Sequence, residues 1–484
     1  MLFNSIEYLI FLAFTVLAFF LLPHKYRWVL LLGASYFFYL SFKIEYIILL
    51  LFSTVITYFA TISIDRTESE RRQTIYLALC LAGNLFVFFY FKYLEFFTQV
   101  LSDALAMVNI TYSPGPLNII LPIGISFYTF QIIGYAIDVY LGVYRAEKNP
   151  GKFSLFVAFF PQLISGPIER ARNLLVQFSE KKTFNADLFK AGIKLITWGL
   201  FKKLVIADRV GMYVGLIYSN PELYNGIQLI MATYLFGLQV YCDFSGYIDM
   251  ARGSAMLMGF RLHKNFDRPF FARNLTNYFT RWHITLFQWF TDYIYTPLAI
   301  RWRAWKIYGA LFAIFITFII SGFWHGSSGN YIAWGAFYGI ALSFEKLTEN
   351  RRKKIFGMLP QSLAIFLGIF ITFHINTLSN TLFATSNFQD AYYVFTHLFD
   401  FNKIQETLGP RGGAQIGRVP PLYYAVIPAL ILIFVEIRQE FFGKKGIFWE
   451  SKYPFLRYLS YVAIVIIILT IGVFDGGQFI YFQF

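Results

Sequence analysis

The chain has 484 residues, of which 57% are hydrophobic, 21% are aromatic and only 14% are charged. An ordinary soluble domain carries roughly 25% charged residues, so this composition cannot supply the charged surface of a water-soluble protein of this length. The modest counts of glycine, proline and cysteine exclude disordered, collagen-like and disulfide-rich proteins. The composition therefore predicts a membrane protein with many spans.

The net charge of +14 comes from short basic clusters between apolar segments. This distribution is typical of proteins that cross the membrane repeatedly and contact anionic lipid headgroups. We therefore expect membrane lipid, and no nucleic acid, as a partner. The two cysteines, Cys80 and Cys242, lie far apart in apolar stretches and form neither a disulfide pattern nor a zinc pattern.

Apolar stretches follow one another along most of the chain, and several are near the ~20 residues that cross a bilayer. In chain order they are Ile6–Leu22, Trp28–Phe42, Ile44–Ile64, Ile75–Leu101, Leu117–Tyr144, Phe153–Ile164, Leu188–Val205, Ile227–Tyr241, Ile284–Ile300, Ile307–Gly322, Tyr331–Leu347, Leu359–His374, Leu422–Glu436 and Tyr458–Val473. The first is expected to be a retained span rather than a signal peptide, because no small-residue cleavage site follows it. The short or interrupted stretches in the middle are typical of re-entrant or interfacial helices.

The loops between the first spans alternate in charge. The loops at 24–27, 66–72 and 145–152 are basic, whereas Ser41–Lys43 has one lysine and Ser102–Pro116 has neither lysine nor arginine. Basic loops face the cytoplasm, so the N-terminus is expected outside it. The basic run Asn350–Lys354 is expected inside and Phe484 outside. No linker divides the chain, so we expect a single membrane-embedded domain over residues 1–484.

Polar residues within apolar segments are costly and are the first candidates for function. For Leu121–Gln131 the structural interpretation is a proline-kinked span whose Ser, Thr and Gln side chains bond neighbouring helices. In Phe159–Arg170 two prolines and a glycine predict a broken helix that lines the protein interior, and an ordinary interfacial loop is the alternative. In Tyr241–Met250, Asp243 and Asp249 flank a Ser-Gly step. We expect the backbone to be broken at Asp243–Asp249, where the aspartates could bind a cation, pair with arginines or satisfy freed backbone groups.

The histidines form the last candidate cluster. Arg281-Trp282-His283 is followed, after an apolar span, by Ser321–Gly326, which contains Trp324 and His325. The chain has no His-Glu-x-x-His or paired-histidine spacing, so we predict no metal site. A buried histidine is commonly structural, but a neutral imidazole in a dry cavity is suited to take a proton from a hydroxyl.

These segments resemble the motifs of the membrane-bound O-acyltransferases, and within them the bacterial branch typified by the alginate O-acetyltransferase membrane subunit. The resemblance rests on five segments in the family's order, all within residues 121–335. They are Leu121–Gln131, Phe159–Ile168, Asp243–Asp249, Arg281–His283 with Asp292–Leu298, and Gly322–Gly326 with Trp334-Gly335. One departure stands at Thr381–Thr385, where related bacterial members carry a Phe-Arg-Ala-like motif.

The resemblance implies an all-α fold, in which a ring of transmembrane and tilted or re-entrant helices surrounds a thin, funnel-pierced centre. It places the family's essential histidine at His325, as general base, and a second histidine at His283, which would steady the oxyanion or orient the base. Trp282 and Trp324 would wall the channel and exclude water, simple packing being the alternative. The expected substrate-channel residues are Trp282, Trp324, Arg281, Asp243, Gly322 and Gly326.

The implied reaction moves an acyl group, expected to be acetyl, from a cytoplasmic thioester toward hydroxyls of an exported polysaccharide. Acetyl-CoA or another acyl thioester would be the donor substrate, with no cofactor bound, and an extracytoplasmic acyltransferase would be a partner. The expected location is the inner (cytoplasmic) membrane. One alternative is D-alanyl transfer from a carrier protein to a teichoic-acid-type polymer. A small-molecule transporter is the alternative from another class, since it would also use embedded aspartates.

Overall fold

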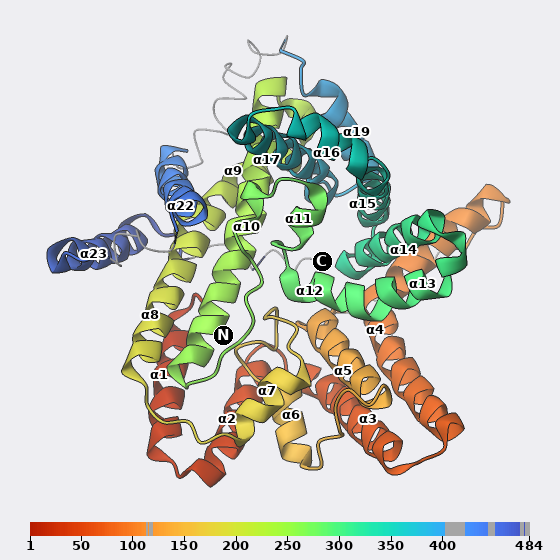
Figure 1. Cartoon of the computed structure of the whole chain (residues 1–484), viewed down its shortest axis with the longest axis vertical. Helices are drawn as coiled ribbons and strands as arrows, with labels where there is room; N and C mark the ends of the chain where they lie inside the picture. The colour runs from red at the N-terminus through yellow and green to blue at the C-terminus, as the bar shows by residue number, and fades with distance from the viewer. Residues whose placement is uncertain (113–114, 116–119, 402–421, 444–450, 475–478, 480–484) are drawn as a thin grey trace. The chain divides into compact units, whose positions relative to one another are not determined.

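The computed structural model describes residues 1–112, 115, 120–401, 422–443, 451–474 and 479. These residues form helices and loops without a strand, which confirms the all-α prediction (Figure 1). The chain divides into two compact units, Met1–Ile196 with Met250–His263, and Thr197–Asp249 with Lys264–Phe484. The single domain expected from the sequence stays a prediction.

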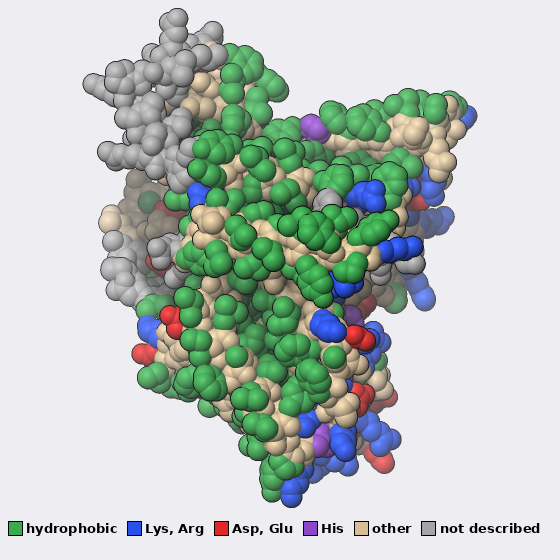
Figure 2. All heavy atoms as spheres, turned by 90° about the vertical axis from the view of Figure 1, so that its left-hand side faces the viewer, with side chains coloured by type: hydrophobic (Ala, Val, Ile, Leu, Met, Phe, Trp, Pro, Cys, Tyr) green, Lys and Arg blue, Asp and Glu red, His purple; other side chains and the backbone are tan. Residues whose placement is uncertain are grey.

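Six helices in the described part of the chain are long and apolar enough to cross a membrane. They are Tyr46–Arg66, Glu70–Met107, Gly226–Leu257, Ile307–His325, Gln361–Ala384 and Pro454–Ile471. Large apolar side chains lie exposed on their surfaces, Phe59 at 63% for example, and apolar side chains cover much of the face in Figure 2. Lipid is the solvent that such surfaces require, so the chain is a membrane protein. The first expected span is α1 (Ile6–Leu21), an apolar helix of only 16 residues.

The first unit contains the N-terminal helices. They are α1, α2 (His24–Leu40), α3 (Tyr46–Arg66), α4 (Glu70–Met107), α5 (Ile125–Tyr140), α6 (Pro150–Ala158), α7 (Ala171–Ser179) and most of α8 (Ala186–Leu200). Helix α6 begins where the Asn149 side chain accepts hydrogen bonds from two backbone N–H groups and Pro150 supplies the first residue. The α3–α4 pair buries a polar contact, in which Asn84 Nδ2 donates to Thr57 Oγ1 at 3.1 Å.

Two of the family-like segments interlock inside the first unit. Gly124, with φ of +81°, begins α5, and a Cβ there would lie 2.7 Å from the backbone oxygen of Leu163. Gln131 on α5 donates to the Phe156 carbonyl at 2.6 Å and accepts from Gln162 at 3.2 Å. Residues 159–170 are not helical, so the predicted break is confirmed. Gln131 thus bonds neighbouring segments of the chain, as the structural interpretation of Leu121–Gln131 predicted.

The second unit begins within α8 and continues through η1 (Phe201–Ala207), a π-helical segment. Its further elements are α9 (Asp208–Tyr218), η2 (Pro221–Leu223), most of α10 (Gly226–Leu257), η3 (Pro269–Phe271), α11 (Leu275–Phe279), α12 (Ile284–Phe290), η4 (Thr291–Tyr295), α13 (Thr296–Arg301), η5 (Arg303–Trp305), α14 (Ile307–His325), α15 (Gly329–Leu347), α16 (Glu349–Gly357), α17 (Gln361–Ser379), α18 (Thr381–Ala384), α19 (Phe388–His397), α22 (Tyr423–Phe441) and α23 (Pro454–Ile471). The site residues predicted from the sequence all lie in this unit.

One expectation about the backbone is wrong. The segment Asp243–Asp249 is not broken by its Ser-Gly step, because α10 runs continuously from Gly226 to Leu257. The glycine instead permits a close approach, since a Cβ at Gly246 would lie 2.8 Å from the Gly199 carbonyl oxygen. The helix is therefore packed tightly against the end of α8 and the beginning of η1 at this step.

Candidate active site

His325 is the last residue of α14 and is 4% exposed. Its ring lies against three aromatic rings, those of Trp324, Trp334 and Phe383, with centroid distances of 4.9, 5.1 and 5.0 Å. All three contacts are close to perpendicular, at 78°, 80° and 78°. The imidazole is therefore held by side chains from α14, α15 and α18 in surroundings that exclude bulk water.

His283 lies at the start of α12 in a left-handed backbone conformation, with φ of 45°. Such a conformation is uncommon for a residue other than glycine and is enriched at functional sites. The turn is fixed by Asn265, whose carbonyl accepts from Ile284 N–H and whose side-chain oxygen accepts from Thr285 N–H. Full burial lowers the pKa of His283 to about 3, so this imidazole is neutral at physiological pH.

Trp324 brings the two histidines together. Its ring centroid lies 5.8 Å from that of His283 and 4.9 Å from that of His325. On its other side His283 contacts Phe244 of α10, at 4.7 Å. Two motifs that are separated in sequence by α12, α13 and most of α14 thus contact one indole ring.

Trp282 and Arg281 take part in separate contacts beside His283. Trp282 is stacked on Tyr278 at 5.6 Å and meets Phe266 edge-on at 5.0 Å. Arg281 forms two hydrogen bonds of 3.0 Å to the carboxylate of Glu440 on α22. These contacts hold the Arg-Trp-His segment in place, whereas the channel role of both residues stays a prediction.

Asp243 belongs to a buried ion-pair network that the sequence did not predict. Lys203 on η1 lies 2.8 Å from Asp208 and 2.5 Å from Asp243, and the neighbouring Lys202 lies 2.7 Å from Asp249. The partners are thus lysines, not the arginines considered from the sequence. Both aspartates of α10 are paired with the π-helical segment, so the network fixes the part of α10 that carries Phe244 to η1.

Gly322 and Gly326 lie where α14 meets α15. A Cβ at Gly322 would lie 2.3 Å from the backbone oxygen of Tyr331 and 3.3 Å from the Cα of Gly335. A Cβ at Gly326 would lie 2.2 Å from the Tyr331 ring. Small residues allow helices to approach closely in membranes, so both glycines have a packing role in this structure. Their predicted role in the channel is untested.

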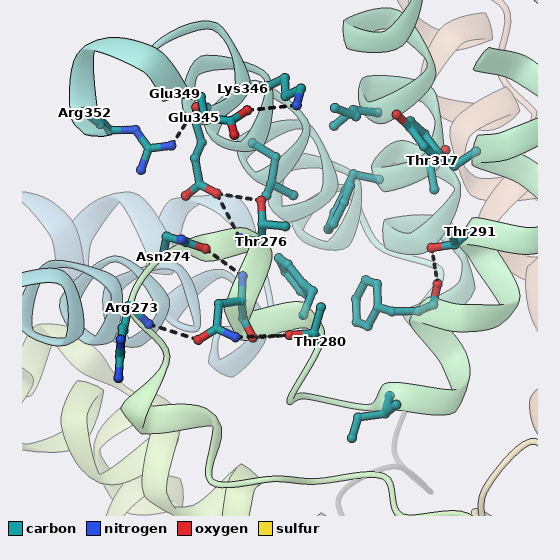
Figure 3. A pocket seen from close by; sticks show the side chains of 18 of the residues that line it. Arg273, Asn274, Thr276, Thr280, Thr291, Thr317, Glu345, Lys346, Glu349 and Arg352 are labelled. Carbon is teal, nitrogen blue, oxygen red and sulfur yellow. Dashed lines mark hydrogen bonds and ion pairs between the residues drawn. The ribbon is translucent and has the colours of Figure 1, made fainter. Parts of the chain in front are cut away.

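A cavity of about 1070 Å³ opens elsewhere in the same unit, lined by residues from α11, α12, α14, α15, α16 and α17 (Figure 3). Its wall is apolar at Phe287 and Phe318 and charged where α15 and α16 meet, with Arg352 and Lys353 from the basic run predicted to be cytoplasmic. None of the six residues assigned to the channel from the sequence lines this cavity. Glu345 accepts hydrogen bonds from Thr276 and so joins α15 to α11 at its edge.

Sequence reasoning missed three residues that touch the histidines, namely Phe244, Trp334 and Phe383. Trp334 belongs to the family-like Trp334-Gly335 motif, to which the sequence assigned no role. Phe383 lies in Thr381–Thr385, where the sequence only showed a difference from related bacterial proteins. Within the described residues there is no group of three or more histidine, cysteine or carboxylate side chains that could hold a metal ion.

A comparison with known protein families shows the family to which the chain belongs. The model of the membrane-bound O-acyltransferase family matches residues 145–386, a range that contains His283 and His325. This chain belongs to the membrane-bound O-acyltransferase family. It is therefore an acyltransferase, and family membership favours the enzyme over the transporter that the sequence left as an alternative.

Relatives of this membrane-bound O-acyltransferase carry names of O-acetylating and D-alanylating enzymes. The chain is 34% identical to a Pseudomonas aeruginosa protein named probable alginate O-acetylase AlgI, over 87% of this chain and 78% of the relative. It is 32% identical to a peptidoglycan O-acetyltransferase of Helicobacter pylori, over 77% and 73% of the two chains. A teichoic acid D-alanyltransferase of Streptococcus thermophilus is 30% identical over 60% of this chain and 75% of its own length.

Proposed function

We propose that this acyltransferase moves an acetyl group from a cytoplasmic thioester toward hydroxyls of an exported polysaccharide, with His325 as the general base. The observation that carries the proposal is the likeness to O-acetylating relatives over most of the chain. The D-alanyltransferase relative matches a smaller part of the chain, which favours acetyl over D-alanyl. The partners we propose are an extracytoplasmic acyltransferase, which completes the transfer, and the polysaccharide acceptor.

The surroundings of His325 support its proposed role. A base that takes the proton of an attacking hydroxyl needs a fixed position and protection from water, because a thioester would otherwise be hydrolysed. The three aromatic rings around His325 and its 4% exposure meet both requirements. The neutral imidazole of His283, on the other side of Trp324, can donate a hydrogen bond without adding a charge.

The charged cavity is the proposed site of the thioester donor. Acetyl-CoA and a phosphopantetheine arm of a carrier protein both combine phosphate with an extended apolar and amide chain. Arg273, Arg352 and Lys353 offer cations for phosphate, and Phe287 and Phe318 line the apolar part. Glu349 already pairs with Lys346 and Lys353, which leaves the two arginines as the stronger candidates for phosphate contact.

The reaction is tested with purified enzyme in liposomes supplied with radiolabelled acetyl-CoA and an oligosaccharide acceptor. His325→Ala is expected to lower kcat by about 10²–10⁴-fold, the usual contribution of a general base. His374→Ala is the matched control, because His374 bonds the Phe370 carbonyl on α17 away from the proposed base. Normal turnover by a folded His325→Ala enzyme would refute the proposal.

The direction of transfer depends on a proposed location in the inner membrane with both termini outside the cytoplasm. The native cysteines Cys80 and Cys242 are buried and give little background for cysteine labelling. Met107→Cys, at a residue 85% exposed, should react with an impermeant thiol reagent in intact cells, and Arg351→Cys only after permeabilisation. The reverse labelling pattern would place the donor cavity on the outer side and contradict the proposed direction.

A further inference from the structure

We propose that the indole Nε1–H of Trp334 and the hydroxyl of Ser321 form an oxyanion hole beside His325. The inference rests on the proposed function, in which His325 is the general base, and adds the groups that stabilise the tetrahedral intermediate. Both residues are buried, Trp334 at 5% exposure and Ser321 at 0%. Neither polar group has a hydrogen-bond partner among the residues that the structure describes.

The indole stands out from the other polar groups on its face of α15. Asn330, Trp334 and Tyr338 are spaced four residues apart and so lie on one side of the helix. Asn330 donates to the Thr385 carbonyl at 3.0 Å, and the Tyr338 hydroxyl bonds Asn376 and Ser379 at 2.6 and 2.7 Å. Only the middle member of this row lacks a described partner, and its ring lies 5.1 Å from that of His325.

The same pattern occurs on α14. Thr317, Ser321 and His325 are also spaced four residues apart on one face. The Thr317 hydroxyl donates to the Ala313 carbonyl four residues earlier, at 2.6 Å, as hydroxyls in helices commonly do. Ser321 could bond the Thr317 carbonyl in the same way but does not, and it lies one helical turn before His325.

The close crossing of α14 and α15 brings these two rows together. Gly322 follows Ser321, Gly335 follows Trp334, and a Cβ at either glycine would lie 3.3 Å from the Cα of the other. A buried donor without a partner is costly, and two of them beside the proposed base call for an explanation: Ser321 one helical turn before it on α14, and Trp334 on α15, whose ring contacts it. A transient negative oxygen at this position would accept from both.

The acceptor oxygen attacks the thioester carbonyl carbon while its proton passes to the imidazole of His325. The carbonyl π electrons move onto oxygen, and that oxyanion accepts hydrogen bonds from the Trp334 N–H and the Ser321 O–H. When the carbonyl re-forms, the C–S bond breaks, and the departing thiolate takes the proton from the imidazolium, which regenerates neutral His325.

The test uses Trp334→Phe and Ser321→Ala in the full-length enzyme in liposomes. Each variant should lower kcat by about 10²–10³-fold, the usual effect of removing one oxyanion donor, while KM for acetyl-CoA changes little. Trp334→Phe should keep the wild-type Tm or raise it, because it removes a buried donor without a described partner and keeps an aromatic ring. Tyr338→Phe is the matched control on the same face: it removes a bonded hydroxyl and should lower Tm with little change in kcat.

The outcomes separate this inference from the proposed function. If folded Trp334→Phe and Ser321→Ala both keep kcat within about tenfold of wild type while His325→Ala is inactive, the oxyanion hole is refuted and the general base is retained. If His325→Ala is active, the proposed function itself is refuted, because it requires His325 as the general base. Should Trp334→Phe fail to fold, Ser321→Ala decides alone, and unchanged kcat in that variant overturns the inference.

Discussion

Removing the ammonium group of Lys203 should destabilise the enzyme far more than removing one of its carboxylate partners. Lys203 lies 2.8 Å from Asp208 and 2.5 Å from Asp243, and all three side chains are at most 6% exposed. Lys203→Met would leave two carboxylates buried without their cation. Asp243→Asn would leave Lys203 paired with Asp208, and the asparagine oxygen could still accept a hydrogen bond.

The loss of stability expected for each variant depends on how deeply the ion pair that it breaks is buried. Breaking a buried ion pair by removing one partner costs about 3–5 kcal/mol, and each kcal/mol corresponds to about 1 °C in a chain of this length, so Lys203→Met should lower Tm by about 3–5 °C. Asp243→Asn replaces one charge-assisted hydrogen bond by a weaker neutral one, which costs at most about 1.5 kcal/mol. Lys264→Met is the control, because Lys264 and Asp267 are 46% and 38% exposed and such a pair contributes at most about 1 kcal/mol.

The loss of folding stability caused by Lys203→Met should also depend on pH. Burial raises the pKa of Asp208 to about 7, above its ordinary value of 3.8. The folded protein therefore holds a proton on Asp208 that the unfolded chain has lost, so stability from this group falls as pH rises between these two values and levels off above about 7. Without Lys203 the folded-state pKa rises further, and protonation relieves the unpaired charge at low pH.

Thermal unfolding of the detergent-solubilised variants, followed by tryptophan fluorescence at about pH 6 and about pH 8, measures both effects. The Lys203→Met deficit should be smaller at the lower pH. Equal losses in Lys203→Met and Asp243→Asn, or a Lys203→Met deficit that widens at the lower pH, would refute the electrostatic account. The network would then act only by filling space between η1 and α10.

Two further predictions concern packing and a second pH-dependent pair. Gly335→Leu should lower Tm and the yield of monodisperse protein, because a Cβ there would lie 2.3 Å from a backbone oxygen of α14, whereas Gly329→Ala, with open space around it, should not. Glu169 raises the pKa of His263 through a 2.7 Å hydrogen bond, so the pair stabilises the fold fully below the unfolded histidine's pKa and loses this contribution as pH rises through the folded value. The Tm difference between wild type and His263→Gln should therefore be larger at about pH 6 than at about pH 8.5, and an unchanged difference would contradict the pairing.

Hydropathy predicted the existence of the long spans but not their ends. The stretch Ile75–Leu101 became α4, a helix of 38 residues from Glu70 to Met107. Such a helix is longer than the ~20 residues that cross a bilayer, because the polar residues on both sides of the apolar core also favour a helix. A hydropathy pattern detects only the apolar part of a helix and gives no information on the polar helical residues beyond it.

The error at Asp243–Asp249 has a different cause. A Ser-Gly step between two aspartates predicts a break when only local sequence is considered, because glycine is a poor helix former and the nearby sequence offers the buried charges no partners. The structure supplies those partners from Lys202 and Lys203, about forty residues earlier in the chain, and the helix continues. Pairing between distant segments cannot be deduced from either segment alone, although the adjacent lysines in an apolar stretch were a visible signal.

The two histidines were found from the sequence because their motifs were recognisable, but their surroundings were not. Phe383 contacts His325 only because the α15–α18 contact, held in part by the Asn330–Thr385 hydrogen bonds, places it there. Phe244 contacts His283 on a stretch of α10 that the lysine network fixes to η1. The rings that confine the proposed base and its neighbour thus come from elements whose positions depend on buried polar pairs. Substitutions in those pairs should alter the geometry of the site even though none of them touches a reacting atom.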